Sequence, residues 1–178
     1  LDITSSGVSS ETTMTSRVLW EFPKTATPSA DRLNMGYSFG RPVIVKTRAA
    51  GWVVIVSSGY NNGTNTGDSG GDGQGRIWIL NARTGDIIRS ISTGVGTTTT
   101  PSGLAHLSAF VERPDVDALV ESVYGGDLLG NLWRFDLSGS TTASWSVTRL
   151  TTLVDASGNI QPITTEPELG IVNRKRMI

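Results

Sequence analysis

Residues 75–81 read GRIWILN, and residues 130–136, which lie 55 positions further on, read GNLWRFD. Both stretches begin with glycine, continue with residues that favour strands and place a tryptophan at the fourth position. Because successive side chains of a strand alternate between its faces, Trp78 and Trp133 should occupy equivalent places in two related sheets. The match indicates an internal structural repeat, and we interpret both tryptophans as core residues rather than as a ligand platform.

Short apolar bursts on either side of these stretches extend the repeat. They are separated by clusters of glycine, proline, asparagine and serine, and none sustains the period of a helix. The bursts predict two sets of four strands. The first set covers residues 42–47, 52–57, 76–80 and 87–91, and the second covers residues 103–110, 119–124, 131–135 and 145–150.

A period of about 40 to 55 residues with four strands in each repeat is typical of β-propeller blades. The sequence therefore predicts an all-β protein, a partial β-propeller built from four-stranded antiparallel blades. Two blades cannot close a ring, which needs about four to eight. Pro42, Pro101 and Pro167 each open a set, so a third blade is expected to begin near the end of the chain.

The expected division of the chain follows from this pattern. Residues 1–16 should be a flexible lead-in, and residues 17–178 should be the propeller fragment. Within the fragment we expect a closing strand of a preceding blade at 17–22, blades at 36–91 and 97–150, and the start of the next blade at 162–178. We interpret the chain as a piece of a longer protein.

Composition argues against several classes of function. The chain has 178 residues, a net charge of −1 and only 17% charged residues, so it has no field that would attract nucleic acid. It contains no cysteine, which excludes disulfides, cysteine-ligated zinc and thiol catalysis. Its apolar runs, such as residues 53–56, are far below the roughly 20 residues of a membrane-spanning helix. We expect neither nucleic-acid binding nor a membrane span.

Residues 67–71 read GDSGG, which matches the sequence around the nucleophile of chymotrypsin-like proteases. The one histidine, His106, follows this serine, whereas those proteases require it before the serine. We interpret the match as coincidental, the segment as a loop, and His106 as a packed strand residue, so no catalytic residue is predicted. Asp68 and Asp72 leave calcium as an alternative for this loop, although two carboxylates are few ligands.

A second acidic loop is a stronger candidate for metal binding. Asp115, Asp117 and Glu121 alternate as carboxylates do in a calcium loop of the EF-hand type. Arg113, however, stands where the first acidic ligand is expected, and Ala118 stands where such loops need glycine for a sharp turn. These residues favour an acidic hairpin turn, with a degenerate calcium site as the alternative.

Three longer segments carry a family resemblance: residues 36–42 (GYSFGRP), 56–62 (VSSGYNN) and 123–136 (VYGGDLLGNLWRFD). Together they resemble the C-terminal propeller of the type IV pilus biogenesis and tip-adhesin family, PilY/PilC. The resemblance implies a fragment of a modified seven-bladed propeller that is not catalytic. It also implies roles in pilus assembly, antagonism of retraction, adhesion and surface sensing, in the periplasm or outer membrane and at the cell surface.

The resemblance also implies partners and a metal site. The partners would be pilins, other pilus assembly proteins and a host-surface receptor. Many family members carry a calcium loop just before the segment at 123–136, and its equivalent here is residues 113–121. The positions that correspond to ligands are Asp115, Asp117, Leu119 (through its carbonyl) and Glu121. Calcium is thus the one cofactor suggested, and the departures at Arg113 and Ala118 argue against it.

Two alternative functions share the same fold. Quinoprotein dehydrogenases use similar blade strands around a pyrroloquinoline quinone, but they need a buried catalytic carboxylate beside calcium, and we can assign no such set. A generic scaffold propeller of the outer-membrane assembly type would have these blades without any connection to pili.

Overall fold

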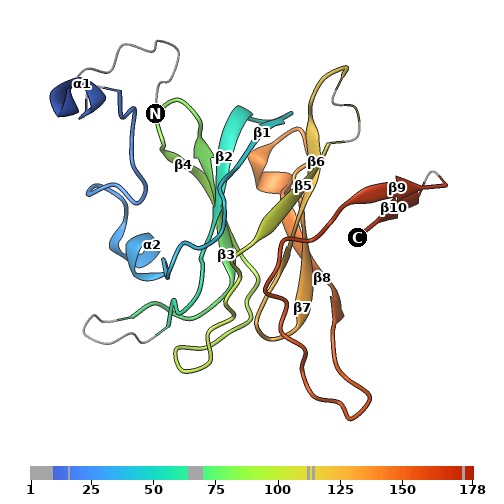
Figure 1. Cartoon of the computed structure of the whole chain (residues 1–178). Coiled ribbons are helices and arrows are strands. Elements are labelled where there is room, and N and C mark those ends of the chain that lie inside the picture. The colour runs from blue at the N-terminus through green and yellow to red at the C-terminus, as the bar shows by residue number, and fades with distance from the viewer. Residues whose placement is uncertain (1–9, 16, 64–69, 112, 114, 174) are drawn as a thin grey trace.

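Two four-stranded antiparallel sheets pack against each other to form the body of the protein (Figure 1). The computed structural model describes all residues except 1–9, 16, 64–69, 112, 114 and 174. The helices are short: α1 covers Glu11–Thr15, α2 covers Ser29–Leu33 and the 3-10 helix η1 covers Thr142–Ser144. The strands are β1 (Val43–Thr47), β2 (Gly51–Ser57), β3 (Arg76–Asn81), β4 (Ile87–Ser92), β5 (Leu107–Val111), β6 (Val120–Gly126), β7 (Asn131–Asp136), β8 (Ser146–Thr152), β9 (Gly170–Val172) and β10 (Lys175–Met177).

Each sheet is a meander in which strand order follows chain order, β1-β2-β3-β4 in the first and β5-β6-β7-β8 in the second. These eight strands lie close to the expected ranges, which confirms the all-β fold with four-stranded antiparallel sheets. The largest difference is in β5, which begins at Leu107 rather than near residue 103. The Gly59 N–H donates to the Leu104 carbonyl at 2.8 Å, so this stretch bonds to a loop of the first sheet instead of continuing β5.

The main hydrophobic core lies between the two sheets. It contains Ile77 and Ile79 from β3 of the first sheet, and Trp133 and Phe135 from β7 of the second. Because successive strand residues alternate between faces, Trp78 points away from this core. It packs in a second cluster on the other face of the first sheet, against the N-terminal segment.

The two repeated tryptophans are both buried, with 0% of Trp78 and 4% of Trp133 exposed. Trp133 faces the first sheet, and Trp78 faces the N-terminal segment, so each indole points toward the part of the chain that precedes its own sheet. Each indole N–H also donates to a carboxylate: Trp78 to Asp31 at 2.7 Å, and Trp133 to Asp127 at 2.8 Å. The repeat therefore extends from the sequence to the environment of the side chains.

The N-terminal segment differs from the expectation. Residues 17–22, expected to be a closing strand, form a turn followed by irregular backbone. Side chains hold this stretch: the Trp20 indole N–H donates to the Ala82 carbonyl at 3.0 Å, and the Phe22 ring centroid lies 5.7 Å from that of Trp78. Within the described chain no strand lies beside it, so Trp20 and Phe22 are partly buried without the ladder bonds that would make them a strand, while Val18 and Leu19 are exposed.

The lead-in expected at residues 1–16 lies mostly outside the described residues. In its described part, Glu11–Thr15 form a single turn of helix, in which Thr15 Oγ1 donates to the Glu11 carbonyl at 3.0 Å. Across the described residues, none of the helices has the length and apolar character to cross a membrane.

Beyond the second sheet, β9 and β10 form a separate antiparallel hairpin on the side away from the first sheet (Figure 1). The Arg176 guanidinium of β10 lies 4.7 Å from the centroid of the Phe110 ring and pairs with the Glu121 carboxylate. The exposed apolar side chains in this part of the chain include Leu150, Ile171 and Val172. The sheets do not close into a ring, as expected of a partial propeller. The start of a next blade at 162–178 stays a prediction.

Candidate functional site

The acidic loop singled out in the sequence connects β5 to β6 at the upper end of the sheets in Figure 1. Leu119, near the end of the loop, forms a parallel bridge with Lys46 of β1. The loop is therefore fixed against the first sheet as well as the second. A small hollow of about 50 Å³ lies beside it, and its lining includes Arg48, Arg113, Asp117, Glu121 and Ser138.

Arg113 organises this loop through both its backbone and its side chain. Its carbonyl accepts hydrogen bonds from the N–H groups of Val116, Asp117 and Ala118 at 3.1, 3.2 and 3.2 Å. Its guanidinium donates to Asp117 Oδ2, and Asp117 Oδ1 accepts the Leu119 N–H at 3.2 Å. Both oxygens of this carboxylate are thus engaged within the loop.

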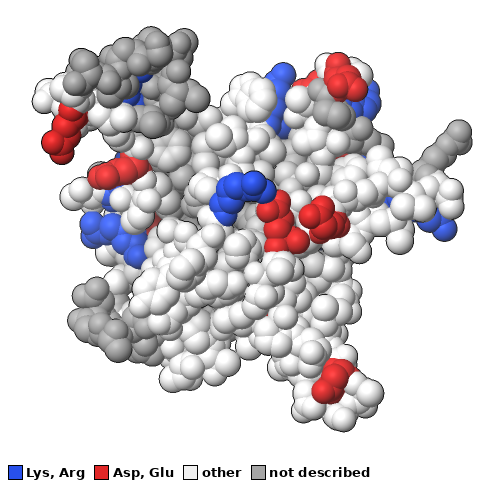
Figure 2. Space-filling view, viewed as in Figure 1, with Lys and Arg blue, Asp and Glu red and all other residues white. Residues whose placement is uncertain are grey.

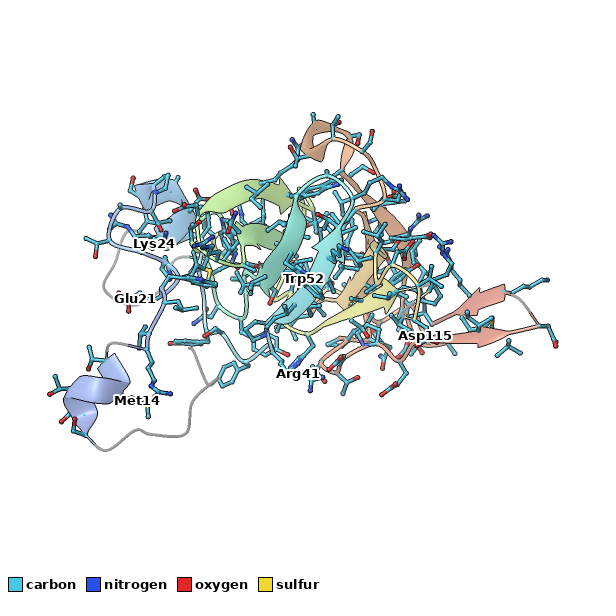
Figure 3. All side chains as sticks on the ribbon, turned by 90° about the horizontal axis from the view of Figure 1, so that it is seen from above. Met14, Glu21, Lys24, Arg41, Trp52 and Asp115 are labelled. Carbon is cyan, nitrogen blue, oxygen red and sulfur yellow. The ribbon has the colours of Figure 1, made fainter. Side chains whose placement is uncertain are left out.

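The other two carboxylates of the loop face elsewhere. Glu121 pairs with Arg176 of β10, and Asp115 is exposed at the end of the sheets onto which Figure 3 looks. Among the described residues, no three acidic, histidine or cysteine side chains are grouped so that they could hold a metal ion. Because a guanidinium already balances Asp117, these residues fit a divalent cation poorly. A degenerate calcium site at Asp115, Asp117, Leu119 and Glu121 stays the alternative hypothesis for this loop.

Ala118 has a backbone φ of 52°, in the left-handed region that favours glycine. The left-handed conformation costs an alanine about 1–2 kcal/mol. Glycine avoids this cost, but its greater conformational freedom in the unfolded chain offsets part of the gain in stability. We expect Ala118→Gly to raise the free energy of unfolding by about 0.5–1 kcal/mol, measured by urea denaturation.

The control is Ala143→Gly in η1, an exposed alanine without positive φ. It should lower the free energy of unfolding by at most about 1 kcal/mol. A loss of stability in the Ala118 variant as well would contradict the left-handed conformation of this loop.

Asp136, at the end of β7, holds the turn that follows it. Partial burial raises the pKa of its carboxyl, but hydrogen bonds from Ser138 and the positive charges of Arg134 and Arg176 outweigh this effect, so the pKa lies below the ordinary value of aspartate. Ser138 donates to Asp136 Oδ1 through its hydroxyl at 2.6 Å and its backbone N–H at 3.0 Å. Asp136 is therefore an ionised structural residue at neutral pH.

A residue that the sequence interpretation missed is Asp127, whose side chain is fully buried. Its carboxylate accepts hydrogen bonds from the Ser102 hydroxyl at 2.9 Å, the Asn131 backbone N–H at 2.8 Å and the Trp133 indole N–H at 2.8 Å. The carboxylate thus connects the stretch before β5, which contains Ser102, to β7, which contains Asn131 and the repeated tryptophan Trp133. All of these donors are neutral groups.

The sequence contains a signal for this turn. The pattern D-x-x-G-N occurs at residues 127–131 and again at residues 155–159. In each copy the aspartate accepts the N–H of the asparagine four positions on, at 2.8 Å. Asp127 is buried and Asp155 is exposed. The pattern therefore predicts the turn, whereas the packing of the sheets decides which copy is buried.

The remaining motifs have structural explanations where they are described. Residues 64–69, which include most of the GDSGG segment, lie outside the described residues. Asp72 forms an ion pair with Arg76 at the start of β3. His106 is half-buried and lies directly before β5.

Three aromatic rings gather at the opposite end of the sheets from the acidic loop. We call Tyr37, Phe39 and Tyr60 the aromatic cluster. The ring centroid of Phe39 lies 6.2 Å from that of Tyr37 and 5.7 Å from that of Tyr60. Phe39 is 67% exposed and Tyr37 is 56% exposed. Exposed aromatic side chains in contact are typical of surfaces that bind another molecule.

Comparison with known proteins agrees with this architecture. The family described as the PilY1 beta-propeller domain matches residues 2–178. A type IV pilus biogenesis factor PilY1 homolog of Xylella fastidiosa is 37% identical over an alignment of 155 residues, and the match covers 83% of this chain and 9% of that protein. The type IV pilus biogenesis factor PilY1 of Pseudomonas aeruginosa strain PAO1 is 28% identical over an alignment of 173 residues, and the match covers 86% of this chain and 14% of that protein.

A solved structure shows the same fold. The crystal structure of the C-terminal domain of Pseudomonas aeruginosa PilY1 superposes with a TM-score of 0.65 and 29% sequence identity, and the match covers 80% of this chain. It covers 31% of the solved chain. The present chain therefore spans less than a third of that structure, and a smaller part still of the two relatives.

Proposed function

Because the chain belongs to the PilY1 beta-propeller domain family, we propose that it forms part of the propeller of a type IV pilus biogenesis protein. The observation that carries this proposal is the family match over residues 2–178, and the fold shared with a solved PilY1 domain supports it. The chain spans 9% and 14% of the two relatives, so the activity of the whole protein is itself part of the proposal.

The whole protein, in this proposal, supports pilus assembly, counteracts retraction, and mediates adhesion or surface sensing. Its place is the periplasm or outer membrane and, after export, the cell surface. Its partners are pilins, other pilus assembly proteins and, for adhesion, a host-surface receptor. The aromatic cluster offers this chain a surface for such contacts. On the face shown in Figure 2, charges of both signs are scattered, which favours protein partners over nucleic acid.

The proposed role is binding rather than catalysis. A quinoprotein dehydrogenase would need a buried carboxylate available to its substrate and cofactor. Asp127 is the one fully buried carboxylate among the described residues, and its oxygens accept hydrogen bonds from Ser102, Asn131 and Trp133. These bonds tie Asp127 to packing, so the observation favours the binding role over the quinoprotein alternative.

Deletion of the complete gene in the bacterium that encodes it tests the proposal. We expect surface pili, counted by electron microscopy, and twitching motility to be largely lost, and a plasmid copy of the gene to restore both. Normal pili and normal twitching in the deletion strain would refute the pilus role and favour the generic scaffold propeller.

A second strain, which also lacks the retraction ATPase, separates the proposed roles. If the protein counteracts retraction, pili should return in the double mutant, because no motor then withdraws them. Bald cells in both strains would show that the protein is needed for assembly itself and would contradict a role limited to counteracting retraction.

A further inference from the structure

We propose that Arg113 serves as the built-in cation of the loop between β5 and β6, so that this loop folds without metal and does not respond to calcium. The guanidinium takes the place that a divalent ion holds in loops of the EF-hand type. This inference concerns the chemistry of one loop and does not rest on the role of the protein in pili.

Arg113 occupies the position at which a calcium loop has its first carboxylate. In such calcium loops, carboxylates at the first, third and fifth positions converge on the ion. Arg113 stands at the first position here, and its guanidinium donates to Asp117, at the fifth. The second oxygen of Asp117 accepts the Leu119 N–H at 3.2 Å. A calcium ion would have to displace the guanidinium and would be repelled by it.

The backbone of the loop already has the sharp turn of a calcium loop. Calcium loops carry an invariant glycine at the sixth position, where the chain turns sharply. Ala118 occupies this position and has a φ of 52°. The Arg113 carbonyl accepts three N–H groups of the same turn. Hydrogen bonds and one ion pair therefore hold a conformation that calcium loops stabilise with the metal.

The two remaining carboxylates of the loop do not converge on a shared site. Glu121, at the ninth position, pairs with Arg176 of the β9–β10 hairpin, and Asp115, at the third, is exposed. Two arginines thus balance two of the three carboxylates in this stretch. The charge that would attract a divalent ion is largely neutralised by the protein itself.

The direct test compares the purified chain with a variant in which the ion site is restored. Calorimetric titration of the unmodified chain with calcium chloride should show no binding heat, and its melting temperature should be the same in millimolar calcium and in EDTA. The double variant Arg113→Asp with Ala118→Gly should bind calcium with a dissociation constant of about 1 mM or tighter, and calcium should raise its melting temperature.

The matched control is Arg149→Asp with Ala143→Gly, which changes charge and glycine content equally at exposed positions of β8 and η1. Calcium should leave its melting temperature unchanged. Calcium binding by the unmodified chain would overturn the proposal. So would a folded Arg113→Asp, Ala118→Gly variant that does not bind calcium.

A double-mutant cycle keeps the proposal testable if the restored variant does not fold. Arg113→Gln in the unmodified chain should reduce the folding equilibrium constant about two- to fivefold in EDTA, as expected for a partly exposed ion pair. The same substitution beside Asp117→Asn should have no further effect. Equal losses in both backgrounds would show that Arg113 does not act through Asp117, and the proposal would fail.

Discussion

Replacing Asp127 with alanine should lower the free energy of unfolding by about 3–5 kcal/mol, because it leaves several buried donors without an acceptor. These donors belong to Ser102, Asn131 and Trp133. Asp127→Asn keeps the shape but turns an N–H toward the same donors, so it should cost about 2–4 kcal/mol. Urea denaturation followed by tryptophan fluorescence measures both effects.

Asp155 provides the matched control, since it closes the same D-x-x-G-N turn at the surface. It accepts the backbone N–H of Asn159 at 2.8 Å, as Asp127 accepts that of Asn131. Asp155→Ala should therefore destabilise the chain far less than Asp127→Ala. Equal losses from the two substitutions would show that the local turn, rather than the buried network, is what matters.

The second large effect is expected from Gly40→Ala. A Cβ built on Gly40 would lie 1.8 Å from the carbonyl oxygen of Ala105, where the approach to β1 meets the approach to β5. That carbonyl also accepts a hydrogen bond from the Ser57 hydroxyl at 2.6 Å, so it cannot move away freely. We expect a loss of about 3 kcal/mol or more in the free energy of unfolding, at the upper end of overpacking effects.

Gly170→Ala is the control for this substitution. No atom lies within 4 Å of a Cβ built on Gly170, and its φ is not in the left-handed region. The free energy of unfolding should change by less than about 0.5 kcal/mol, as at other exposed sites. Equal tolerance of Gly40→Ala would contradict the close approach of the segment before β1 to the Ala105 carbonyl.

The fold was largely predictable because its signals are local. Alternating apolar residues and glycine-rich turns located the eight strands of the two sheets, and the shared register of Trp78 and Trp133 indicated that the sheets are related. The strand expected at 17–22 is absent because a strand needs a neighbouring strand, which an apolar pattern alone does not provide. Residues 103–106, expected to begin β5, likewise have no strand partner in the described chain, since the Leu104 carbonyl accepts the Gly59 N–H of a loop.

The candidate site was predictable only in part. The sequence located the acidic loop and its two departures from a calcium loop, at Arg113 and Ala118. It did not show that Arg113 pairs with Asp117, or that Glu121 pairs with Arg176, which is far away in the chain. Asp127 was missed because its turn pattern is the same whether it is buried or exposed, and its burial depends on side chains that pack around it, such as those of Ser102 and Trp133.

The measurement that tests the central claim most directly is the number of surface pili on cells that express the full-length protein with Asp127→Ala or with Asp155→Ala. If this propeller is needed for pilus biogenesis, the Asp127 variant should produce few pili and the Asp155 variant should produce close to the normal number. Limited proteolysis of the same proteins reports whether the propeller is folded. Normal piliation by an Asp127 variant whose propeller is unfolded would contradict the account.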